Sequence, residues 1–264
     1  MIDANALIGA LPRMLSGDEL MRELRVMPEY DPGVCDRDEA MRLMRLSDLY
    51  DIYLPSAMSV EIYSKLYLAL IRSLQKKGSR LAVRQYAENY KAVRQRDYSG
   101  ILGGSDSFTI IGTSGIGKSS AISKAIQQIS ENRIIGLEQP HTKIVPCVVV
   151  QCPFDSSVKG LLLEILRQVD EELDTRYYDN AVRARATTDM LIGSVSQVAL
   201  NHIGLLVVDE IQHVVNSKNG KALVGSLTQL INCSGISICK YRNKYSKSLI
   251  YYIIKIIRDG KILV

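Results

Sequence analysis

The feature that most constrains this chain is a glycine-rich run that begins at Gly112. Its sequence, Gly112-Thr-Ser-Gly-Ile-Gly-Lys-Ser119, follows the pattern G-x-x-x-x-G-K and then Ser or Thr, which defines a phosphate-binding loop. Glycines let such a loop wrap so that backbone N–H groups point at phosphate oxygens, and the helix that follows adds its positive end. We therefore expect phosphates to be bound by Gly112, Thr113, Ser114, Gly115, Ile116, Gly117, Lys118, Ser119 and Ser120.

The residues around this run fit the same interpretation. Phe108-Thr-Ile-Ile111 reads as a strand before the loop, and Ala121–Ile129 reads as a helix after it. Lys118 is then placed to reach the β- and γ-phosphates, and the Ser119 hydroxyl to ligate Mg²⁺. The alternative is a glycine-rich turn that happens to precede a helix.

A pair of acidic residues further along the chain makes that alternative weaker. The apolar run Leu205-Leu-Val-Val208 predicts a buried parallel strand, and Asp209 and Glu210 follow it directly. Asp209 suits a Walker B residue that holds Mg²⁺, and Glu210 suits the general base that orients the attacking water. The adjacent Asp-Glu pair points to ATPases whose sheet inserts an additional strand beside the strand of the phosphate loop. ATP is favoured over GTP because the sequence has no Asn-Lys-x-Asp motif.

Short β-rich runs alternate with helical stretches from Ser107 onward, which indicates βαβ units and a parallel sheet. The fold class we expect is therefore α/β, a P-loop NTPase sheet with flanking helices, preceded by a helical region. The expected divisions are a helical N-terminal region (1–100), a nucleotide-binding core that is incomplete at its C-terminal end (101–239) and an atypical basic tail (240–264). Strands are expected near 107–112, 144–151, 203–208 and 235–239, with helices near 117–130, 156–173, 185–201 and 219–233.

The first hundred residues predict helices joined by loops. Residues 38–50 and 57–75 are dense in apolar residues, and the breadth of the apolar surface in the second predicts a buried helix. A third helix, near 80–96, places Ala82, Tyr86, Tyr90 and Val93 on one apolar stripe. Residues 76–96 supply the best local candidate for a DNA contact, although a solvated amphipathic face is the simpler explanation. The basic residues of this stretch are Lys76, Lys77, Arg80, Arg84, Lys91, Arg94 and Arg96.

Composition and charge narrow the class of protein. Hydrophobic residues at 47% and charged residues at 23% are ordinary globular usage. No signal peptide and no apolar run long enough for a bilayer is visible, so we expect a soluble cytoplasmic protein with no membrane partner. The net charge of +5 argues little about the main body, because basic residues concentrate in residues 240–264.

Four further stretches, in this order and spacing, resemble the TnsC/TniB family of transposition ATPases. The resemblance implies an AAA+ protein that binds ATP and Mg²⁺ and assembles on duplex DNA as rings or helical filaments. It also implies two protein partners, a transposase and a target-selection protein. The stretches are Leu49-Tyr-Asp-Ile-Tyr-Leu-Pro55, Gln151-Cys-Pro-Phe-Asp-Ser-Ser-Val-Lys-Gly-Leu161, the segment Asp170–Tyr178, and His202-Ile-Gly-Leu-Leu-Val-Val-Asp-Glu-Ile-Gln212.

The family pattern breaks after Ile238, where a Gly-Thr-Pro-like turn, an arginine-finger region and a helical lid would follow. Residues 240–257 are instead rich in Lys, Ile, Tyr and Asn, the composition that a shifted reading frame in A/T-rich DNA would give. We expect an interrupted gene product that binds ATP·Mg²⁺ but hydrolyses it slowly, because an arginine finger contributes about 10³–10⁵ in rate. The alternative is a genuine short variant whose basic tail binds phosphate backbone.

Three functions remain open on the sequence. The leading one is an ATP-dependent regulator that licenses a transposase on target DNA. The others are a signalling or defence ATPase that gates protein assembly without DNA, and a remnant without activity. Gln212 and His213 follow the acidic pair directly, and their side chains either report the γ-phosphate to a neighbouring subunit or cap the start of a helix.

Overall fold

A computed structural model describes residues 3–95, 100–102, 107–131, 134–138, 141–211 and 217–243. Gln212, His213 and most of the basic tail, residues 244–264, lie outside the described residues. Among the described residues, no helix is both long enough and apolar enough to cross a membrane.

The centre of the molecule is a five-stranded sheet in the order β1-β5-β4-β3-β2. Strands β1 (Phe108–Gly112), β5 (Ser237–Asn243), β4 (Ile203–Asp209) and β3 (Thr142–Gln151) pair in parallel, and β2 (Ile135–Leu137) pairs antiparallel with β3. The predicted parallel sheet is therefore confirmed, and β5 is the additional strand between the strand of the glycine-rich loop and the strand of the acidic pair. The short strand β2 was not predicted.

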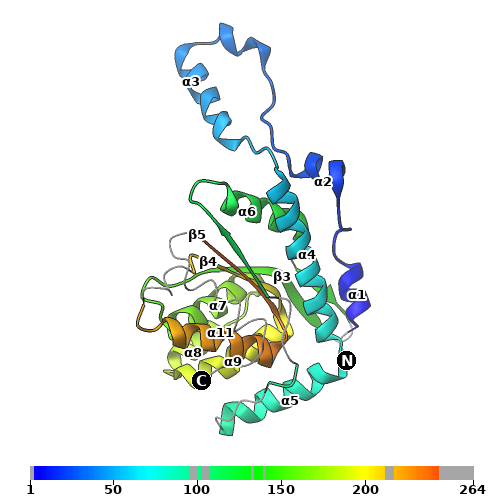
Figure 1. Cartoon of the computed structure of the whole chain (residues 1–264), viewed down its shortest axis with the longest axis vertical. Helices are drawn as coiled ribbons and strands as arrows, with labels where there is room; N and C mark the ends of the chain where they lie inside the picture. Colours follow the sequence, from blue (N-terminus) through cyan, green and yellow to red (C-terminus); the bar gives the residue numbers. More distant parts are fainter. Residues whose placement is uncertain are drawn as a thin grey trace.

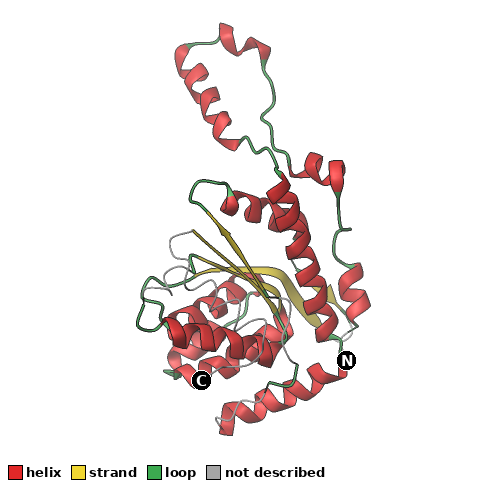
Figure 2. Ribbon diagram, in the orientation of Figure 1, coloured by secondary structure: helices red, strands yellow, loops and turns green. Residues whose placement is uncertain are grey.

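Helices cover both faces of the sheet and form the three layers seen in Figure 2. One face carries α7 (Val158–Leu173), α9 (Thr188–His202) and α11 (Gly220–Ser234), whose apolar residues pack on alternate residues of β3, β4 and β5. The other face carries α4 (Ala57–Lys77) and α6 (Lys118–Ile129), together with α1 (Ala4–Gly9) and α2 (Gly17–Leu24) (Figure 1). A further helix, α8 (Tyr177–Arg183), was not predicted and packs beside α7.

The long helix α4 belongs to the same core as the sheet, which confirms the predicted buried helix. Its residues Leu66, Leu70 and Leu74 are fully buried against the face that also packs α6. A Cβ atom at Gly204 on β4 would lie 2.5 Å from the Leu70 side chain and 2.5 Å from the Pro146 carbonyl oxygen. Only glycine therefore allows α4 and β3 to approach β4 this closely.

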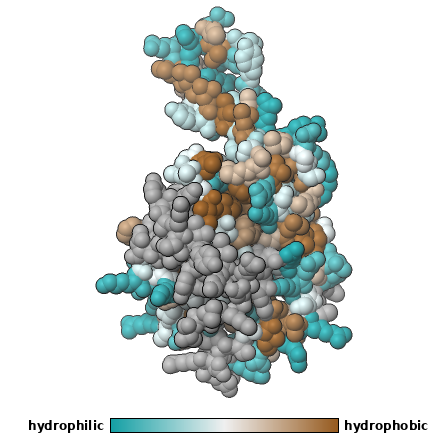
Figure 3. All heavy atoms as spheres, in the orientation of Figure 1, coloured by the Kyte–Doolittle hydropathy of each residue, from teal (hydrophilic) through white to brown (hydrophobic). Residues whose placement is uncertain are grey.

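Residues 27–55 form an arm that projects from the body between α2 and α4 (Figure 1). It contains the short helices Pro32–Asp36 and Asp48–Asp51 and the helix α3 (Glu39–Ser47), and its base is fixed by the bridge between Val26 and Tyr53. The predicted helix near 38–50 is therefore present, but α3 has no buried residue. Its apolar side chains face solvent (Figure 3), among them Leu43, Met44 and Leu46, and Leu49 and Tyr50 of the following short helix are exposed as well.

The helix α5 (Arg80–Gln95) is present where predicted, but the predicted apolar stripe is wrong. Tyr86 and Tyr90 are exposed, whereas Ala82, Gln85 and Asn89 are buried against α9 and α11. Burial of the two amides is possible because both are hydrogen-bonded. Gln85 Nε2 donates to Asn89 Oδ1 at 2.8 Å, and Asn89 Nδ2 donates to the Cys233 carbonyl at 2.8 Å. The buried face of α5 therefore packs partly through hydrogen-bonded amide side chains and not through the apolar stripe that was predicted.

A buried lysine ties α4 to the end of α9. Lys77 is 3% exposed, and its Nζ donates to the carbonyl oxygens of Ala199 and Leu200, each at 2.6 Å. These carbonyls belong to the last turn of α9, where a cation also interacts favourably with the helix dipole. Burial lowers the pKa of Lys77 to about 7. The last-turn carbonyls of α9 are therefore satisfied from a helix that lies more than a hundred residues earlier.

The same helix end carries His202, which is held in its neutral form. Its Nδ1 lies 2.9 Å from the Lys143 carbonyl oxygen and its Nε2 lies 3.1 Å from the Tyr177 hydroxyl. Because a carbonyl only accepts, Nδ1 carries the proton and Nε2 accepts from Tyr177. Burial, and secondarily the charge of Lys77, lowers the pKa of His202 below its ordinary 6.5, while the bond to Lys143 opposes this.

Replacing Lys77 should weaken the fold. Lys77→Ala leaves the two carbonyls without this donor and removes the packed stem, so we expect a loss of about 2 kcal/mol in the free energy of unfolding. Chemical denaturation measures it. The matched control is Lys65→Ala on the same helix, because Lys65 is exposed and pairs only at the surface with Glu61, which is worth less than about 1 kcal/mol. Equal losses in the two variants would contradict this assignment.

His202 should make the fold sensitive to acid. Because its pKa is lower in the folded than in the unfolded chain, the unfolded chain binds more protons as the pH falls through 6.5 and below. The contribution of His202 to stability is therefore present above pH 6.5 and decreases on acidification. Thermal melting from pH 7.5 to 5.5 should show a smaller decrease in His202→Gln than in the parent chain. Identical acid profiles would show that His202 does not carry this effect.

Candidate functional site

The glycine-rich run forms the turn between β1 and α6, as the sequence predicts. Gly115 and Gly117 have φ angles of +79° and +85°, a region that side-chain-bearing residues rarely adopt. Gly117 is also the residue that precedes the first turn of α6. The loop therefore places the free N–H groups of that turn beside a backbone that curves back over them, which is the arrangement that binds anions.

Lys118, the first residue of α6, is folded back over the loop. Its side chain is 5% exposed, and Nζ donates to the carbonyl oxygens of Gly112 at 3.1 Å and Thr113 at 2.6 Å. A Cβ atom at Gly112 would lie 3.2 Å from the Lys118 side chain, so the lysine packs directly over that glycine. The ammonium is therefore held at the mouth of the loop, where an incoming anion would meet it.

Asp209 ends β4, and its neighbour Glu210 bends the chain away from the sheet. Glu210 has a φ of +54°, a left-handed conformation that costs a residue with a side chain about 1 kcal/mol or more. Its backbone N–H donates to Asp209 Oδ1 at 2.6 Å. The Asp209 carbonyl accepts from the Cys152 N–H at 2.9 Å, which fixes the end of β4 to the end of β3. Such local strain is typical of functional sites.

A tyrosine that the sequence analysis did not select lies between the two halves of the site. Tyr241 of β5 is level with Asp209 in the sheet register and belongs to the core cluster on the α6 face. Burial is the largest cause that raises the pKa of this phenol, and the nearby Asp209 carboxylate raises it further. The negative charge of Glu210 acts in the same direction, which places Glu210 near the same group. The structure thus brings together Asp209 and Glu210, two of the predicted site residues, beside this phenol.

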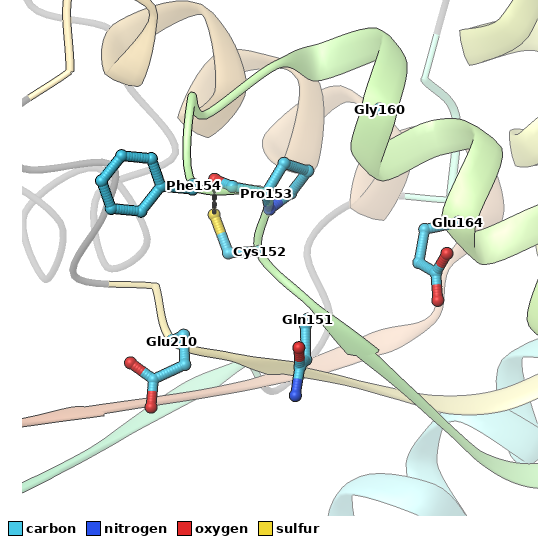
Figure 4. Close-up of a pocket in the computed structure, with 7 residues that line it drawn as sticks. All are labelled: Gln151, Cys152, Pro153, Phe154, Gly160, Glu164 and Glu210. Atoms are coloured by element: carbon cyan, nitrogen blue, oxygen red, sulfur yellow. Dashed lines mark hydrogen bonds between the residues drawn. The ribbon is translucent and has the colours of Figure 1, made fainter.

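A cavity of about 410 Å³ lies beside Glu210 at the carboxyl ends of β3 and β4. Figure 4 shows Glu210 on one side, Gln151 at the sheet edge and Glu164 on α7 across the opening. Gln151 pairs in register with Asp209, and Phe154 in the following loop is 85% exposed. Parallel α/β sheets bind their ligands at this edge, so the cavity adjoins the place where the sequence predicts a reaction.

The remaining predicted basic groups are distributed differently from expectation. Lys77, counted among the candidates for DNA contact, is buried at the end of α9 and is not available to a partner. Arg80, Arg84 and Lys91 are exposed on α5, while the side chain of Arg94 and the whole of Arg96 lie outside the described residues. Lys240, counted with the basic tail, is a buried residue of β5 that is 3% exposed.

A family model described as an AAA domain matches residues 102–241, more than half of the chain. The chain belongs to the AAA domain family. A search of curated proteins gave no match. The AAA domain match includes the loop, the acidic pair and Tyr241, and it agrees with the P-loop NTPase fold predicted from the sequence.

Tyr241 was missed because the sequence analysis ended the last strand of the AAA domain near Cys239. In the structure β5 continues to Asn243, and Cys239 to Asn243 pair with β1. The alternation of Cys239, Lys240 and Tyr241 is a signal that could have extended the strand, since successive residues of a strand face opposite sides of the sheet. The roles suggested for Gln212 and His213 fall outside the described residues.

Lys118→Ala should remove nucleotide binding from this AAA domain. A lysine that makes charge-assisted bonds to phosphate contributes enough that its loss should weaken binding at least about tenfold. Binding of a fluorescent ATP analogue measures the effect. The control is Lys124→Ala, because Lys124 lies on the same helix and its Nζ donates to Gln127 at 3.4 Å. A Lys118→Ala chain that binds as tightly as the control would contradict the site.

Proposed function

We propose that this AAA domain protein is an ATP- and Mg²⁺-dependent regulator of DNA transposition. In this proposal the ATP-bound chain assembles on duplex DNA and licenses a transposase. The observation that carries the nucleotide part is the glycine-rich loop between β1 and α6, over which Lys118 is folded so that its Nζ donates to the carbonyls of Gly112 and Thr113. The transposition part is supported by the resemblance of four sequence stretches to the TnsC/TniB family.

The residues present fit a nucleotide with its metal. A Cβ atom placed on Gly115 or Gly117 would meet nothing within 4 Å, so no described residue packs against the loop at these two positions. The hydroxyl of Ser119 and the carboxylate of Asp209 are oxygen ligands, which Mg²⁺ prefers. When bound, Mg²⁺ would neutralise charge that develops on the phosphates.

The chain's own residues then have defined tasks. Lys118 must exchange the carbonyls of Gly112 and Thr113 for phosphate oxygens, which is favourable because a phosphate carries a full negative charge. Glu210, beside Asp209, is the group that would accept a proton from the attacking water. Slow hydrolysis stays a prediction. The Gly-Thr-Pro-like turn would follow Ile238, where β5 instead continues to Asn243, and residues 244–264 lie outside the described residues.

The DNA part of the proposal places duplex DNA against α5. Arg80 and Arg84 are exposed on this helix one turn apart, and Tyr86 and Tyr90 of the same helix are exposed at 49% and 59%. Arginines neutralise backbone phosphates, and their contacts make affinity depend steeply on salt. A ring or filament of several copies, a transposase and a target-selection protein are the other partners that the resemblance implies.

A second candidate is a signalling or defence ATPase that gates protein assembly without DNA. The arm of residues 27–55 favours it, because exposed apolar side chains such as Leu43 and Met44 suit a protein contact rather than a phosphate backbone. An inactive remnant is the third reading of the sequence, and nucleotide binding by the purified chain would argue against it.

DNA binding decides between the first two functions. We expect the purified chain to bind duplex DNA with ATP or a non-hydrolysable analogue, to bind less as salt is raised, and not to bind in Lys118→Ala. Fluorescence anisotropy of a labelled duplex measures this. Reversal of the basic face with Arg80→Glu and Arg84→Glu should weaken binding, whereas Lys65→Glu on α4 should not. Binding that is independent of nucleotide would reject the proposal, and no binding in any nucleotide state would favour the second candidate.

A further inference from the structure

The helix α3 packs only within the arm, in the part of the chain that the structure describes. It is nine residues long, and none of its residues is buried. Its main contacts are with the two short helices of the same arm. Isolated helices shorter than about 12–15 residues are marginal in water, and proteins stabilise such helices by packing their apolar face. The apolar face of α3 therefore requires a surface that the described part of its own molecule does not supply.

The arm combines this apolar face with negative charge. Leu43, Met44 and Leu46 of α3 are 59%, 66% and 55% exposed. The arm contains seven acidic and three basic residues, a net charge of −4. Two of the acidic residues pair with arginines of the arm itself, whereas Asp36 and Glu39 are exposed and make no ion pair within the described residues. Exposed apolar side chains beside such charge favour a partner surface that is both apolar and basic.

The outer face of α5 has the complementary character. Val83 and Tyr86 lie one turn apart and are 55% and 49% exposed. Arg80 and Arg84 are also exposed, and neither makes an ion pair among the residues that the structure describes. Residues three or four apart are neighbours on a helix surface, so Arg80 adjoins both Val83 and Arg84. The whole helix carries four basic residues and one acidic residue, a net charge of +3. Helix α5 therefore offers apolar side chains and positive charge on one exposed surface.

The arm and α5 do not meet within one molecule. The arm projects from one end of the body, and α5 lies at the opposite end (Figure 1). The base of the arm is fixed by the bridge between Val26 and Tyr53, and α5 is packed against α9 and α11. Each copy of the chain nevertheless carries both surfaces, so the two are present at equal concentration in any solution of the protein. A contact between them would join unlike surfaces of two copies.

We propose that the arm of one copy docks on the outer face of α5 of a second copy. The apolar side chains of α3 pack against Val83 and Tyr86. The acidic residues of the arm lie near Arg80 and Arg84, where the opposite charges attract. An arm of this length can supply the roughly 20–30 residues that one side of a stable interface uses. Both surfaces lie outside residues 102–241, which match the AAA domain, so the contact is distinct from any contact at the nucleotide site.

The contact covers the face of α5 on which the proposed function places duplex DNA. The arm and the phosphate backbone both present negative charge to Arg80 and Arg84, so the two exclude each other. Copies of the chain are then held together by their arms when DNA is absent, and the arms leave α5 when DNA is bound. The competition with DNA rests on the proposed function, whereas the contact between copies does not.

Sedimentation velocity of the purified full chain tests the contact. We expect species larger than the monomer that increase with protein concentration and decrease as salt is raised. Leu43→Ser combined with Met44→Ser should leave a monomer, and so should Val83→Ser combined with Tyr86→Ser. All four side chains are exposed, so both variants should fold. The control is Leu68→Ser, which should associate like the parent chain because Leu68 is 48% exposed on α4, outside both surfaces.

Mixing the two double variants decides whether unlike surfaces meet. Each variant alone lacks one half of the contact, but together they supply one intact arm and one intact α5 face. We expect the equimolar mixture to form a complex of two chains. A mixture that stays monomeric overturns the proposal, as does a parent chain that is monomeric at every concentration. Continued association of the α5 variant alone also overturns it, because the arm would then be bound elsewhere.

A labelled duplex tests the competition. If arms cover about two thirds to nine tenths of the α5 faces, the parent chain should bind DNA about threefold to tenfold more weakly than the variant with Leu43→Ser and Met44→Ser. Anisotropy with a non-hydrolysable ATP analogue measures both affinities at protein concentrations where the parent chain associates. Equal affinities, or weaker binding by the variant, overturn the competition. DNA binding by neither chain refutes the proposed function instead, and the mixing experiment still decides the contact between copies.

Discussion

The insertion of β5 between β1 and β4 is the constraint on which the site depends. Adjacent strands lie about 4.8 Å apart, so the strand of the phosphate loop and the strand of the acidic pair are separated by roughly 10 Å. The end of β5 therefore lies between the two halves of the site, and Tyr241 is the residue of β5 that is level with Asp209. Its side chain is 7% exposed and belongs to the same core cluster as Ala121 and Ile122 of α6.

The N-terminal helices stabilise that sheet from outside the region that the family match covers, which begins at residue 102. Helix α4 fills one face because Gly204 allows close approach, and Lys77 at its end satisfies the last carbonyls of α9 on the other side of the sheet. Helix α5 continues this link through Asn89 to α11. The stability of the AAA domain is therefore coupled to α4 and α5, which precede it in the sequence and are followed by the glycines at 100, 103 and 104.

The sequence predicted the parts of this structure that local chemistry determines. The loop at Gly112 and the strand that ends at Asp209 follow from spacing and apolar runs, so strand order and site position could be inferred before any coordinates. The exposure of α3 could not, because an amphipathic pattern does not state whether a partner surface is present. Nor could the burial of Gln85, since its partners at residues 101 and 102 are far along the chain. Tyr241 was missed because its strand was predicted to end near Cys239, and local sequence patterns place strand ends least well.

The end of β4 shows how Asp209 is oriented by the backbone alone. The backbone carbonyl of Asp209 accepts from the Cys152 N–H, and one carboxylate oxygen accepts from the Glu210 N–H. The second bond depends on the left-handed backbone of Glu210, which costs about 1 kcal/mol or more. A hydrogen bond to a charged carboxylate is stronger than one between neutral groups, so it offsets part of that cost. The strained turn at Glu210 and the orientation of the Asp209 carboxylate are therefore two results of one local arrangement.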